Sequence, residues 1–393
     1  MDHVSEPPWT YLDHGASTPL RPEVASAMAN VLSQPLGNPT GSHRPAQRAR
    51  RLLEESRDEI AGLLGRSPGD IVFTSGGTES ANLAVFGTLG AAVRAGRAPT
   101  VLSSAVEHPA VRESCRVAAQ TPSVTWREVP VDAGGVVALD ALAEQVDDAT
   151  ALVAVMLANN ETGVVQPLAR VAALVKERCG TANVFTDAVQ AAPFMSLADA
   201  AAGADLIALS AHKVGGPVGV GALAVHPSTE IDAHHPGGGQ ERGRRSGTQD
   251  VVGAVGLATA LRLAAADRDD DVRRVAALRD RLAEGLFGAI AGTHRTVPVG
   301  VATLPGHLHL CFGGVDREEL LVALGERGLC VSGGSSCASG ALEPSYVLAA
   351  MGVAEPLARG AIRFTLGHGT AAADVDRALA VVPVVVGALR HGS

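Results

Sequence analysis

The stretch Ser210-Ala211-His212-Lys213-Val214-Gly215-Gly216-Pro217 links the predicted fold to the predicted chemistry. It follows Asp205-Leu206-Ile207-Ala208-Leu209, a short apolar run bounded by polar residues that predicts a buried β-strand. Lys213 therefore lies in a glycine-rich loop at the carboxyl end of that strand. Ammonium groups are rarely left in apolar surroundings unless they are paired or deprotonated, so Lys213 is a candidate amine nucleophile. The alternative is a lysine that extends from the strand end into solvent.

Strand and helix patterns alternate on both sides of this stretch. Apolar runs end at Thr74, Ser104, Leu157 and Thr186, and a polar or glycine-containing turn follows each of them. A further apolar run covers 220–225. Alternation of this kind predicts a large α/β domain, in which helices cover both faces of a mostly parallel sheet.

The pattern changes in the last third of the chain. Apolar residues within 272–290 recur at three- and four-residue spacing and predict an amphipathic helix. Strands are expected at 307–312, 329–331 and 362–364, followed by a terminal helix that Pro383 is expected to interrupt. These elements predict a second, smaller α+β domain.

Composition limits the possible functions. With 393 residues, of which 46% are hydrophobic and 45 are glycine, the chain can form two domains and a large core. The formal net charge of -9 argues against a general nucleic-acid binder. No apolar run approaches the roughly 20 residues of a membrane span. Residues 1–8 lack the features of a signal peptide, so we expect no membrane association and a cytoplasmic location.

The cysteines are few for this length and odd in number, which fits a reducing compartment. Cys337 lies in the Gly/Ser-rich run 332–340 and is a candidate nucleophile, with accidental exposure as the alternative. Cys311 shares a strand face with His307 and His309, but an ordinary sheet face is favoured over a metal site, and no metal is expected. The cysteines expected to be buried and inert are Cys115, Cys179, Cys311 and Cys330.

Polar residues follow five of the predicted strands, namely Thr78, His108, Asn160, Asp187 and Lys213. Because the carboxyl ends of parallel strands meet at one edge of a sheet, these residues are expected to converge on one crevice. The set suits pyridoxal 5'-phosphate: His108 would stack on the ring, Asn160 would donate to the phenolate oxygen and Asp187 would keep the ring nitrogen protonated. Each also has an ordinary explanation: His108 as a helix-start residue, Asn160 as a turn residue and Asp187 as a loop carboxylate. The joint placement of these residues favours a pyridoxal phosphate site.

Anions have three further candidate partners. Gly76 and Gly77 lie between a strand and a helix, where free backbone N–H groups favour a phosphate, although an ordinary tight turn capped by Thr78 is the alternative. The glycine-rich loop 236–248 carries three arginines, which suits either closure over an anion or a solvated surface. Arg363, near the end of a buried strand, requires a carboxylate from a substrate or from an internal Asp or Glu.

Several short motifs occur in order along the whole chain. They are Tyr11-Leu12-Asp13, Gly37-Asn38-Pro39, Phe73-Thr74-Ser75-Gly76-Gly77-Thr78-Glu79-Ser80, Glu107-His108, Asn159-Asn160-Glu161, Asp187-Ala188-Val189-Gln190, Ala211-His212-Lys213, Gly237-Gly238-Gly239-Gln240-Glu241-Arg242, Arg245-Ser246-Gly247-Thr248 and Leu342-Glu343-Pro344-Ser345-Tyr346. On these motifs the chain resembles the cysteine desulfurases, within the class V aminotransferase group of fold-type I pyridoxal phosphate enzymes. The spacing from Val331 to Leu342 resembles the long-loop subgroup.

The resemblance implies a fold-type I architecture. A mostly parallel seven-stranded sheet would form the large cofactor-binding domain, and a smaller α+β C-terminal domain would carry the catalytic cysteine loop. The expected divisions are an N-terminal segment at 1–20 that packs near the small domain, the large domain at 21–253 and the small domain at 254–393.

The resemblance also implies roles for single residues. Lys213 would bind the cofactor aldehyde, His108 would stack on the ring and Asp187 would bind its nitrogen. Gln190 and Asn160 would lie beside the phenolate oxygen. The phosphate would be held by Gly77, Thr78, Ser210, His212 and, in a homodimer, Thr248 of the partner subunit.

For the substrate, the resemblance implies that Arg363 binds the carboxylate of L-cysteine, helped by Asn38 or Asn160. Cys337 would accept the sulfur as a persulfide, release L-alanine and pass the sulfur to an acceptor protein in iron-sulfur cluster assembly, tRNA thiolation or another sulfur pathway. Housekeeping relatives dock an iron-sulfur scaffold through a C-terminal extension, which this sequence is expected to lack. One alternative is another pyridoxal-dependent aminotransferase or lyase, such as a selenocysteine lyase, in which Cys337 is dispensable. The other is a non-catalytic interaction subunit on the same fold.

Overall fold

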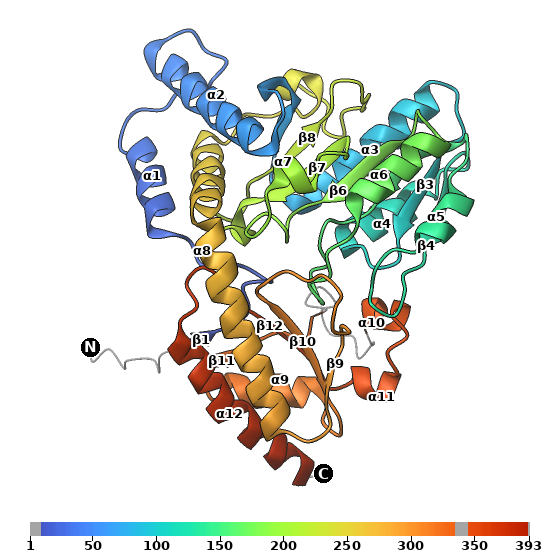
Figure 1. The fold of residues 1–393 in the computed structure, drawn as a ribbon. Coiled ribbons are helices and arrows are strands. Elements are labelled where there is room, and N and C mark those ends of the chain that lie inside the picture. The colour runs from blue at the N-terminus through green and yellow to red at the C-terminus, as the bar shows by residue number, and fades with distance from the viewer. Residues whose placement is uncertain (1–8, 335–344, 392–393) are drawn as a thin grey trace.

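A seven-stranded β-sheet organises the larger part of the structure, a computed structural model that describes residues 9–334 and 345–391 (Figure 1). β8 is antiparallel to both of its neighbours, and the other pairs are parallel. The predicted mostly parallel sheet is therefore confirmed. In sheet order the strands are β2 (Ile71–Thr74), β8 (Gly221–Val225), β7 (Leu206–Ser210), β6 (Asn183–Asp187), β5 (Thr150–Ala154), β3 (Thr100–Ser104) and β4 (Thr125–Val129).

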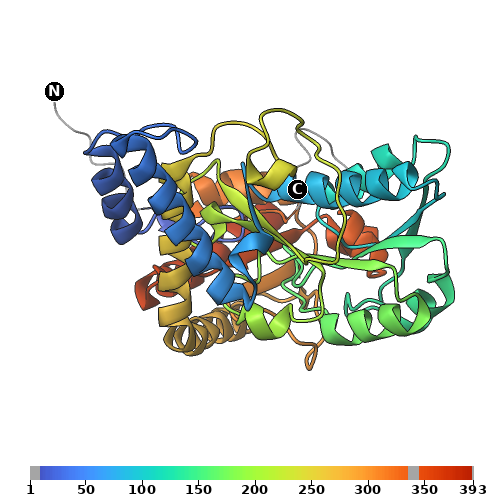
Figure 2. The same ribbon diagram turned by 90° about the horizontal axis from the view of Figure 1, so that it is seen from above.

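Helices cover both faces of this sheet, as Figure 2 shows from above. Alternate residues of a strand point to opposite faces, so Ile207 and Leu209 of β7 pack into one core while Leu206 and Ala208 pack into another. Both cores are apolar, which explains why the central strands read as continuous apolar runs. The covering helices are α3 (Gly77–Arg94) and α4 (Pro109–Ala118) on one face, and α2 (Arg44–Leu64), α5 (Leu139–Gln145), α6 (Leu168–Arg178) and α7 (Leu197–Ala200) on the other.

The smaller part combines the C-terminal elements with the first strand of the chain. An antiparallel sheet has the order β12-β10-β9, and β1 pairs in parallel with β11. Leu12 packs into the same core as Leu310 and Phe364, so the N-terminal segment contributes to this part. Its elements are β1 (Thr10–Tyr11), β9 (Thr293–Arg295), β10 (His307–Phe312), α9 (Arg317–Gly325), β11 (Leu329–Cys330), α10 (Tyr346–Ala350), α11 (Glu355–Ala358), β12 (Ala361–Thr365) and α12 (Ala372–His391).

A single long helix, α8 (Val251–Ala289), runs through both parts (Figure 1). Its first half contributes Leu257 and Leu261 to the core of the large sheet, and its second half contributes Leu282 and Leu286 to the second core. The helix α1 (Pro22–Leu32) packs beside it. Within residues 9–334 and 345–391, neither α8 nor any other helix combines the length and the apolar composition required to cross a membrane.

The last helix does not stop at Pro383, so the expected interruption is wrong. α12 continues from Ala372 to His391 with Pro383 inside it. Proline lacks the N–H that would bond to the preceding turn, which costs the helix one hydrogen bond. The neighbouring side chains of Val382, Val385 and Val386 are buried in the second core. That burial holds the helix together across the missing bond.

An ion pair that is buried on both sides fixes the loop 236–248 to the large sheet. Arg57 and Glu241 form two hydrogen bonds of 2.8 and 2.9 Å, and their side chains are 3% and 0% exposed. Glu241 also accepts a hydrogen bond from the backbone N–H of Phe73 at 2.9 Å. Arg245 of the same loop pairs with Glu79 at 2.8 Å. The loop is therefore held by internal contacts on the surface of the large domain.

Removal of the charge from Glu241 is expected to destabilise the fold. Glu241→Gln keeps the shape of the side chain but leaves the buried Arg57 guanidinium with only the half-exposed Glu54 as a counter-ion. Loss of the buried partner of such a pair typically costs about 3–5 kcal/mol. Urea unfolding measures the loss. The matched control is Glu113→Gln in the exposed pair with Arg116, expected to change stability by less than about 0.5 kcal/mol. Equal stability of the Glu241→Gln variant and the wild type would contradict the expectation.

Candidate active site

A cavity of about 550 Å³ opens at the carboxyl ends of the parallel strands. It lies where an open α/β sheet is expected to bind ligands. Residues from the N-terminal loop, the large sheet and the C-terminal part all contribute to its wall. The predicted site residues that line it are Gly77, Thr78, His108, Asn160, Asp187, Gln190, Ser210, His212, Lys213 and Arg363.

Lys213 lies at the end of the 3-10 turn that follows β7. Its half-buried side chain points toward the N-terminal loop, where Nζ donates hydrogen bonds to the carbonyls of Gly15 at 2.6 Å and Ala16 at 2.8 Å. The hydroxyl of Thr18 donates to the Lys213 carbonyl at 2.9 Å. The N-terminal loop therefore determines where the amine lies.

Asp187 and His108 provide a buried acid and a half-buried base on the same wall. Asp187 ends β6, and its Oδ1 accepts a hydrogen bond from the Val189 N–H at 2.9 Å. Burial raises the pKa of Asp187, and the nearby charges of His108 and Lys213 oppose this rise. Burial lowers the pKa of His108. The Nδ1 atom of His108 accepts from the backbone N–H of Ala110 at 3.1 Å, so the neutral ring carries its proton on Nε2.

The N-terminus of α3 forms an anion-binding surface. Its first residue is Gly77 and its N-cap is Gly76, whose φ of 149° favours glycine and which supplies no side-chain cap. The alternative in which Thr78 caps the helix is therefore wrong. A side chain at Gly77 would approach Val189 Cγ2 to 3.0 Å, so glycine also keeps the backbone accessible. Burial, with the charge of Lys213, lowers the pKa of neighbouring His212 to about 4 and keeps that ring neutral at pH 7.

Arg363 has an internal carboxylate partner, which answers a question that the sequence left open. Its side chain is 1% exposed, and Nη2 donates to Asp13 Oδ1 at 2.7 Å. Nη1 donates to the carbonyl of Asn160 at 2.8 Å. Within the described residues, Arg363 Nε and Asn160 Oδ1 are buried without a hydrogen-bond partner. These two bonds use two of the five guanidinium N–H groups, so Arg363, which lines the cavity, retains donors for a second anion.

The remaining predicted residues lie elsewhere. Asn38 is exposed, and its side-chain oxygen accepts hydrogen bonds from the backbone and the hydroxyl of Thr40. Thr248 is exposed in the loop 236–248. Neither residue lines the cavity of the single chain. Cys337 lies outside the described residues.

The cavity residues that received no individual role from the sequence include Arg112, Glu161, Ser345 and Tyr346. Arg112 follows His108 by four residues, which places both on one face of α4 and is a signal that the sequence offered. Glu161 and Ser345 bond to each other across 184 residues of chain. No spacing rule predicts such a contact.

The other cysteines differ from expectation in one case. Cys115, Cys179 and Cys311 are buried, as predicted, but Cys330 is only half-buried because it ends β11 at the edge of a two-stranded sheet. Burial raises the pKa of the Cys115, Cys311 and Cys330 thiols, so these groups are protonated at neutral pH. In the part of the chain that the structure describes, His, Cys, Asp and Glu side chains form no group of three that could hold a metal ion.

Comparison with known proteins identifies the family. The model for the family Aminotransferase class-V matches residues 10–378. The chain belongs to the class-V aminotransferase family. It is 40% identical over 390 residues to an IscS-like cysteine desulfurase of Mycobacterium tuberculosis, covering 98% of both chains. It is 38% identical over 386 residues to cysteine desulfurase IscS of Methanosarcina thermophila, covering 98% of this chain and 93% of the relative.

Solved structures agree with this family assignment. A NifS-like protein superimposes with a TM-score of 0.90 at 33% identity, covering 97% of this chain and 100% of that one. SspA in complex with cysteine superimposes with a TM-score of 0.77 at 28% identity, covering 91% and 98%. The resemblance to cysteine desulfurases and the fold-type I architecture of this class-V aminotransferase are confirmed.

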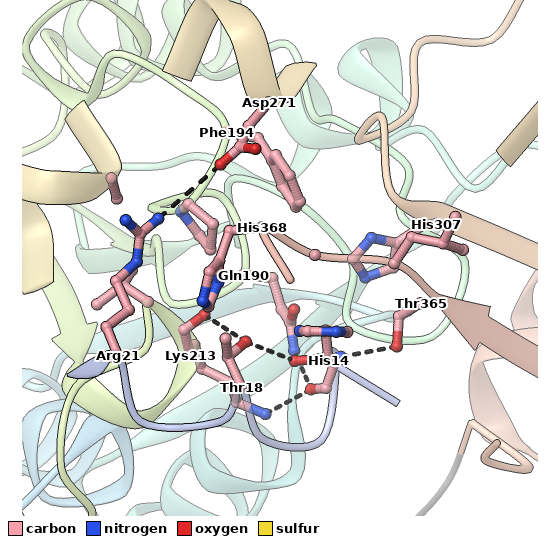
Figure 3. Close-up of a pocket in the computed structure, with 16 residues that line it drawn as sticks. His14, Thr18, Arg21, Gln190, Phe194, Lys213, Asp271, His307, Thr365 and His368 are labelled. Atoms are coloured by element: carbon pink, nitrogen blue, oxygen red, sulfur yellow. Dashed lines mark hydrogen bonds and ion pairs between the residues drawn. The ribbon is translucent and has the colours of Figure 1, made fainter. Parts of the chain in front are cut away.

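A second, smaller crevice of about 20 Å³ lies on the other side of Lys213 (Figure 3). Gly15, Gln190 and Lys213 line both spaces and so form the wall between them. The Gln190 side-chain amide donates to the carbonyl of Gly15 at 2.6 Å. Arg21 at the rim of this crevice pairs with Asp267 at 2.6 Å. In this class-V aminotransferase, Gln190 and Lys213 thus both hold the N-terminal loop through the carbonyl of Gly15.

Glu107 is a carboxyl group buried directly before His108. It is 0% exposed, and Oε1 accepts hydrogen bonds from Ser104 Oγ at 2.6 Å and Met156 N at 2.7 Å. Burial raises the pKa of Glu107 to about 8, and the charge of Asp187 adds to the rise. Glu107 is therefore mostly neutral at pH 7 and adds little negative charge next to Asp187.

The raised pKa of Glu107 predicts a pH-dependent stability. Between about pH 4.5 and 8 the unfolded carboxyl ionises while the folded one keeps its proton, so this group's contribution to stability is lost as the pH rises. Glu107→Gln removes that titration. Its stability relative to wild type is expected to increase by up to about 1.4 kcal/mol per pH unit across this window. Urea unfolding at pH 5, 6, 7 and 8 measures it, and a constant difference between the two proteins would contradict the assignment.

Proposed function

We propose that this chain is a cysteine desulfurase that uses pyridoxal 5'-phosphate to convert L-cysteine to L-alanine. The observation that carries the proposal is the convergence of Lys213, Asp187, His108 and Arg363 on one cavity. An amine, a buried carboxylate, an imidazole and a guanidinium are the groups that this chemistry requires at a single site. The names of the relatives and the cysteine bound to SspA agree with it.

The residues around the cavity fit the cofactor. Lys213 supplies an amine for the aldehyde, and the uncapped N-terminus of α3 at Gly77 supplies backbone N–H groups for the phosphate. Thr78, Ser210 and His212 line the same cavity and would complete the phosphate site. The buried Asp187 carboxylate requires a cationic or hydrogen-bonding partner, which a protonated ring nitrogen would provide.

When bound, pyridoxal phosphate withdraws electrons from the Cα of the substrate amino acid. Asp187 would hold the proton on the ring nitrogen, and His108 would cover the ring face. Gln190 and Asn160 would donate to the phenolate oxygen. Lys213 Nζ would move the Cα proton, because Lys213 is the one lysine among the described residues that line this cavity.

Arg363 would bind the substrate carboxylate. Asp13 and the Asn160 carbonyl already fix the plane of its guanidinium, so the remaining N–H donors are held in a preorganised orientation. Asn160 would contribute its side-chain amide at the same place. Asn38 is exposed and outside this cavity in the single chain, so a role in substrate binding would require a second chain.

Cys337 would accept the sulfur. In this step the Cβ–S bond of L-cysteine breaks as an S–S bond forms with the Cys337 thiolate, and the bonding electron pair stays on carbon, which takes up protons to give L-alanine. The product is a persulfide on Cys337, from which an acceptor protein would take the sulfur. The described cysteines have raised pKa values or are buried, so they are poor substitutes for this thiol.

The active form would be a homodimer. Thr248 is exposed on a loop that the Arg57–Glu241 pair fixes in place, and it does not reach the cavity of its own chain. A fixed, outward-facing hydroxyl suits a contact with the phosphate of a neighbouring chain. Thr248 of the partner subunit would then complete the phosphate site.

Substitution of Lys213 is expected to abolish turnover. Lys213→Ala removes the amine that binds the aldehyde and moves the Cα proton, so alanine formation from L-cysteine should fall by at least about 100-fold. The variant should also lose the visible absorbance of the covalently held cofactor. The control is Lys176→Ala, which replaces a lysine in the last turn of α6. Retention of absorbance and activity in Lys213→Ala would contradict the assigned role.

Substitution of Cys337 tests the sulfur transfer itself. Cys337→Ser should keep the cofactor absorbance but lose at least about 100-fold in alanine and sulfide formation with a thiol reductant present, because a hydroxyl is a far weaker nucleophile than a thiolate. Cys179→Ser serves as the control. Equal alanine formation by wild type and Cys337→Ser would instead favour another aminotransferase or lyase. A wild-type protein that stays colourless with added cofactor would favour a non-catalytic subunit.

A further inference from the structure

Thr365 is a buried residue at the end of β12, two positions after Arg363. Each of these two residues is 1% exposed. Side chains two residues apart on a strand point to the same face, and here both of them contact the N-terminal segment. Arg363 binds Asp13, and Thr365 Oγ1 accepts a hydrogen bond from the backbone N–H of Gly15 at 2.7 Å (Figure 3). One strand therefore holds two successive points of that segment.

The backbone of Thr365 is bonded to the same segment. Its N–H donates to the carbonyl of Leu12 at 2.8 Å, and its carbonyl accepts from the N–H of His14 at 3.2 Å. These two bonds do not involve the side chain, so they remain when the side chain is replaced. The hydroxyl supplies only the bond to Gly15 and a long bond of 3.5 Å to the Leu12 carbonyl. The role of the hydroxyl can therefore be separated from the role of the strand.

Gly15 connects Thr365 to the wall of the main cavity. Its N–H faces Thr365, while its carbonyl accepts hydrogen bonds from Lys213 Nζ and from the Gln190 side-chain amide, each at 2.6 Å. Lys213 and Gln190 line the main cavity, whereas Thr365 lines only the smaller crevice. Any effect of Thr365 on the amine is therefore transmitted by Gly15.

The conformation of Gly15 depends on such bonds more than that of other residues would. Glycine has no Cβ atom, so its backbone dihedral angles are the least restricted of any residue. Its N–H and its carbonyl belong to the two peptide units on either side of it, and the Thr365 hydroxyl holds the first of these units. Without the hydroxyl, the buried N–H would lose its partner, and the loop would have to rearrange to satisfy it.

We propose that Thr365 is a positioning residue that, through the Gly15 N–H, holds the Gly15 carbonyl where it binds and orients the Lys213 amine. This inference rests on the proposed function, in which that amine binds the cofactor aldehyde and moves the Cα proton. A lysine side chain has several rotatable bonds, so an amine without a fixed acceptor takes many orientations, of which few are reactive. Since Arg363 is on the same strand, β12 would place both the substrate carboxylate and the amine.

The first test separates reaction from binding. Thr365→Val keeps the branched shape of the side chain but removes the hydroxyl. In the holoenzyme, kcat for alanine formation from L-cysteine should fall by about ten-fold. KM should stay within about two-fold, because Arg363 keeps its bonds to Asp13 and Asn160. Thr365→Ser retains the hydroxyl and should recover most of kcat.

A second test examines the amine without any substrate. Pyridoxal phosphate is added to the full chain stripped of cofactor, and the visible absorbance of the covalently held cofactor is followed over time. This absorbance should develop about ten-fold more slowly in Thr365→Val than in the wild type. The matched control is Thr150→Val, which should change neither kcat nor this rate. Thr150 is 0% exposed, and its hydroxyl accepts from the N–H of Asp147 at 3.0 Å, but it lies at the start of β5, away from the cavity.

Three results would overturn the proposal: an unchanged kcat and capture rate in Thr365→Val, equal losses in Thr365→Ser and Thr365→Val, or equal losses in Thr150→Val. If Thr365→Val does not fold, Thr365→Ala removes the same hydroxyl from a smaller side chain and should show the same losses. A wild-type protein that captures the cofactor but forms no alanine from L-cysteine would refute the proposed function instead. The capture rates of the variants would then still decide the role of Thr365.

Discussion

The hydrogen bonds from Lys213 Nζ to the carbonyls of Gly15 and Ala16 connect the two parts of the molecule at the point where chemistry would occur. The N-terminal loop that provides these carbonyls is paired with the smaller part, since β1 lies beside β11 and Asp13 binds Arg363. The amine and the guanidinium are therefore placed by one short stretch of chain. Movement of that stretch would displace both groups together.

Three buried carboxyl groups line or support the cavity, and each is stabilised differently. Glu107 keeps its proton because burial dominates its pKa. Asp187 lies within reach of the charges of His108 and Lys213. Glu161 is bonded to the Ser345 hydroxyl. Close carboxylates that were all ionised would repel one another and raise the cost of burial. Because Glu107 is protonated and Glu161 is bonded to Ser345, Asp187 stays available to a cationic group in the cavity.

The large sheet could be predicted because local patterns determine it. Runs such as 71–73 and 206–209 are apolar throughout, and the polar residues after each run indicated the cavity edge. The contacts that complete the site could not be predicted in this way. Asp13 and Arg363 are 350 residues apart, and only the pairing of β1 with β11 and of Asp13 with Thr365 brings them together. Pro383 misled the local rule because burial of its neighbours outweighs one missing hydrogen bond.

The N-terminal loop that places Lys213 and Arg363 is in turn supported by packed elements of both parts. α8 extends over 39 residues, or about 58 Å at 1.5 Å per residue, and contributes to the apolar cores of both parts. Hinge motion between the parts would have to break those packed faces, so the two cores limit how far the two parts can move relative to each other. The contacts of Ser345 with Glu161 and of Tyr346 with Glu107 then attach the start of α10 to the large part of the structure. Precise placement of a reacting group is most reliable when its support is packed in this way.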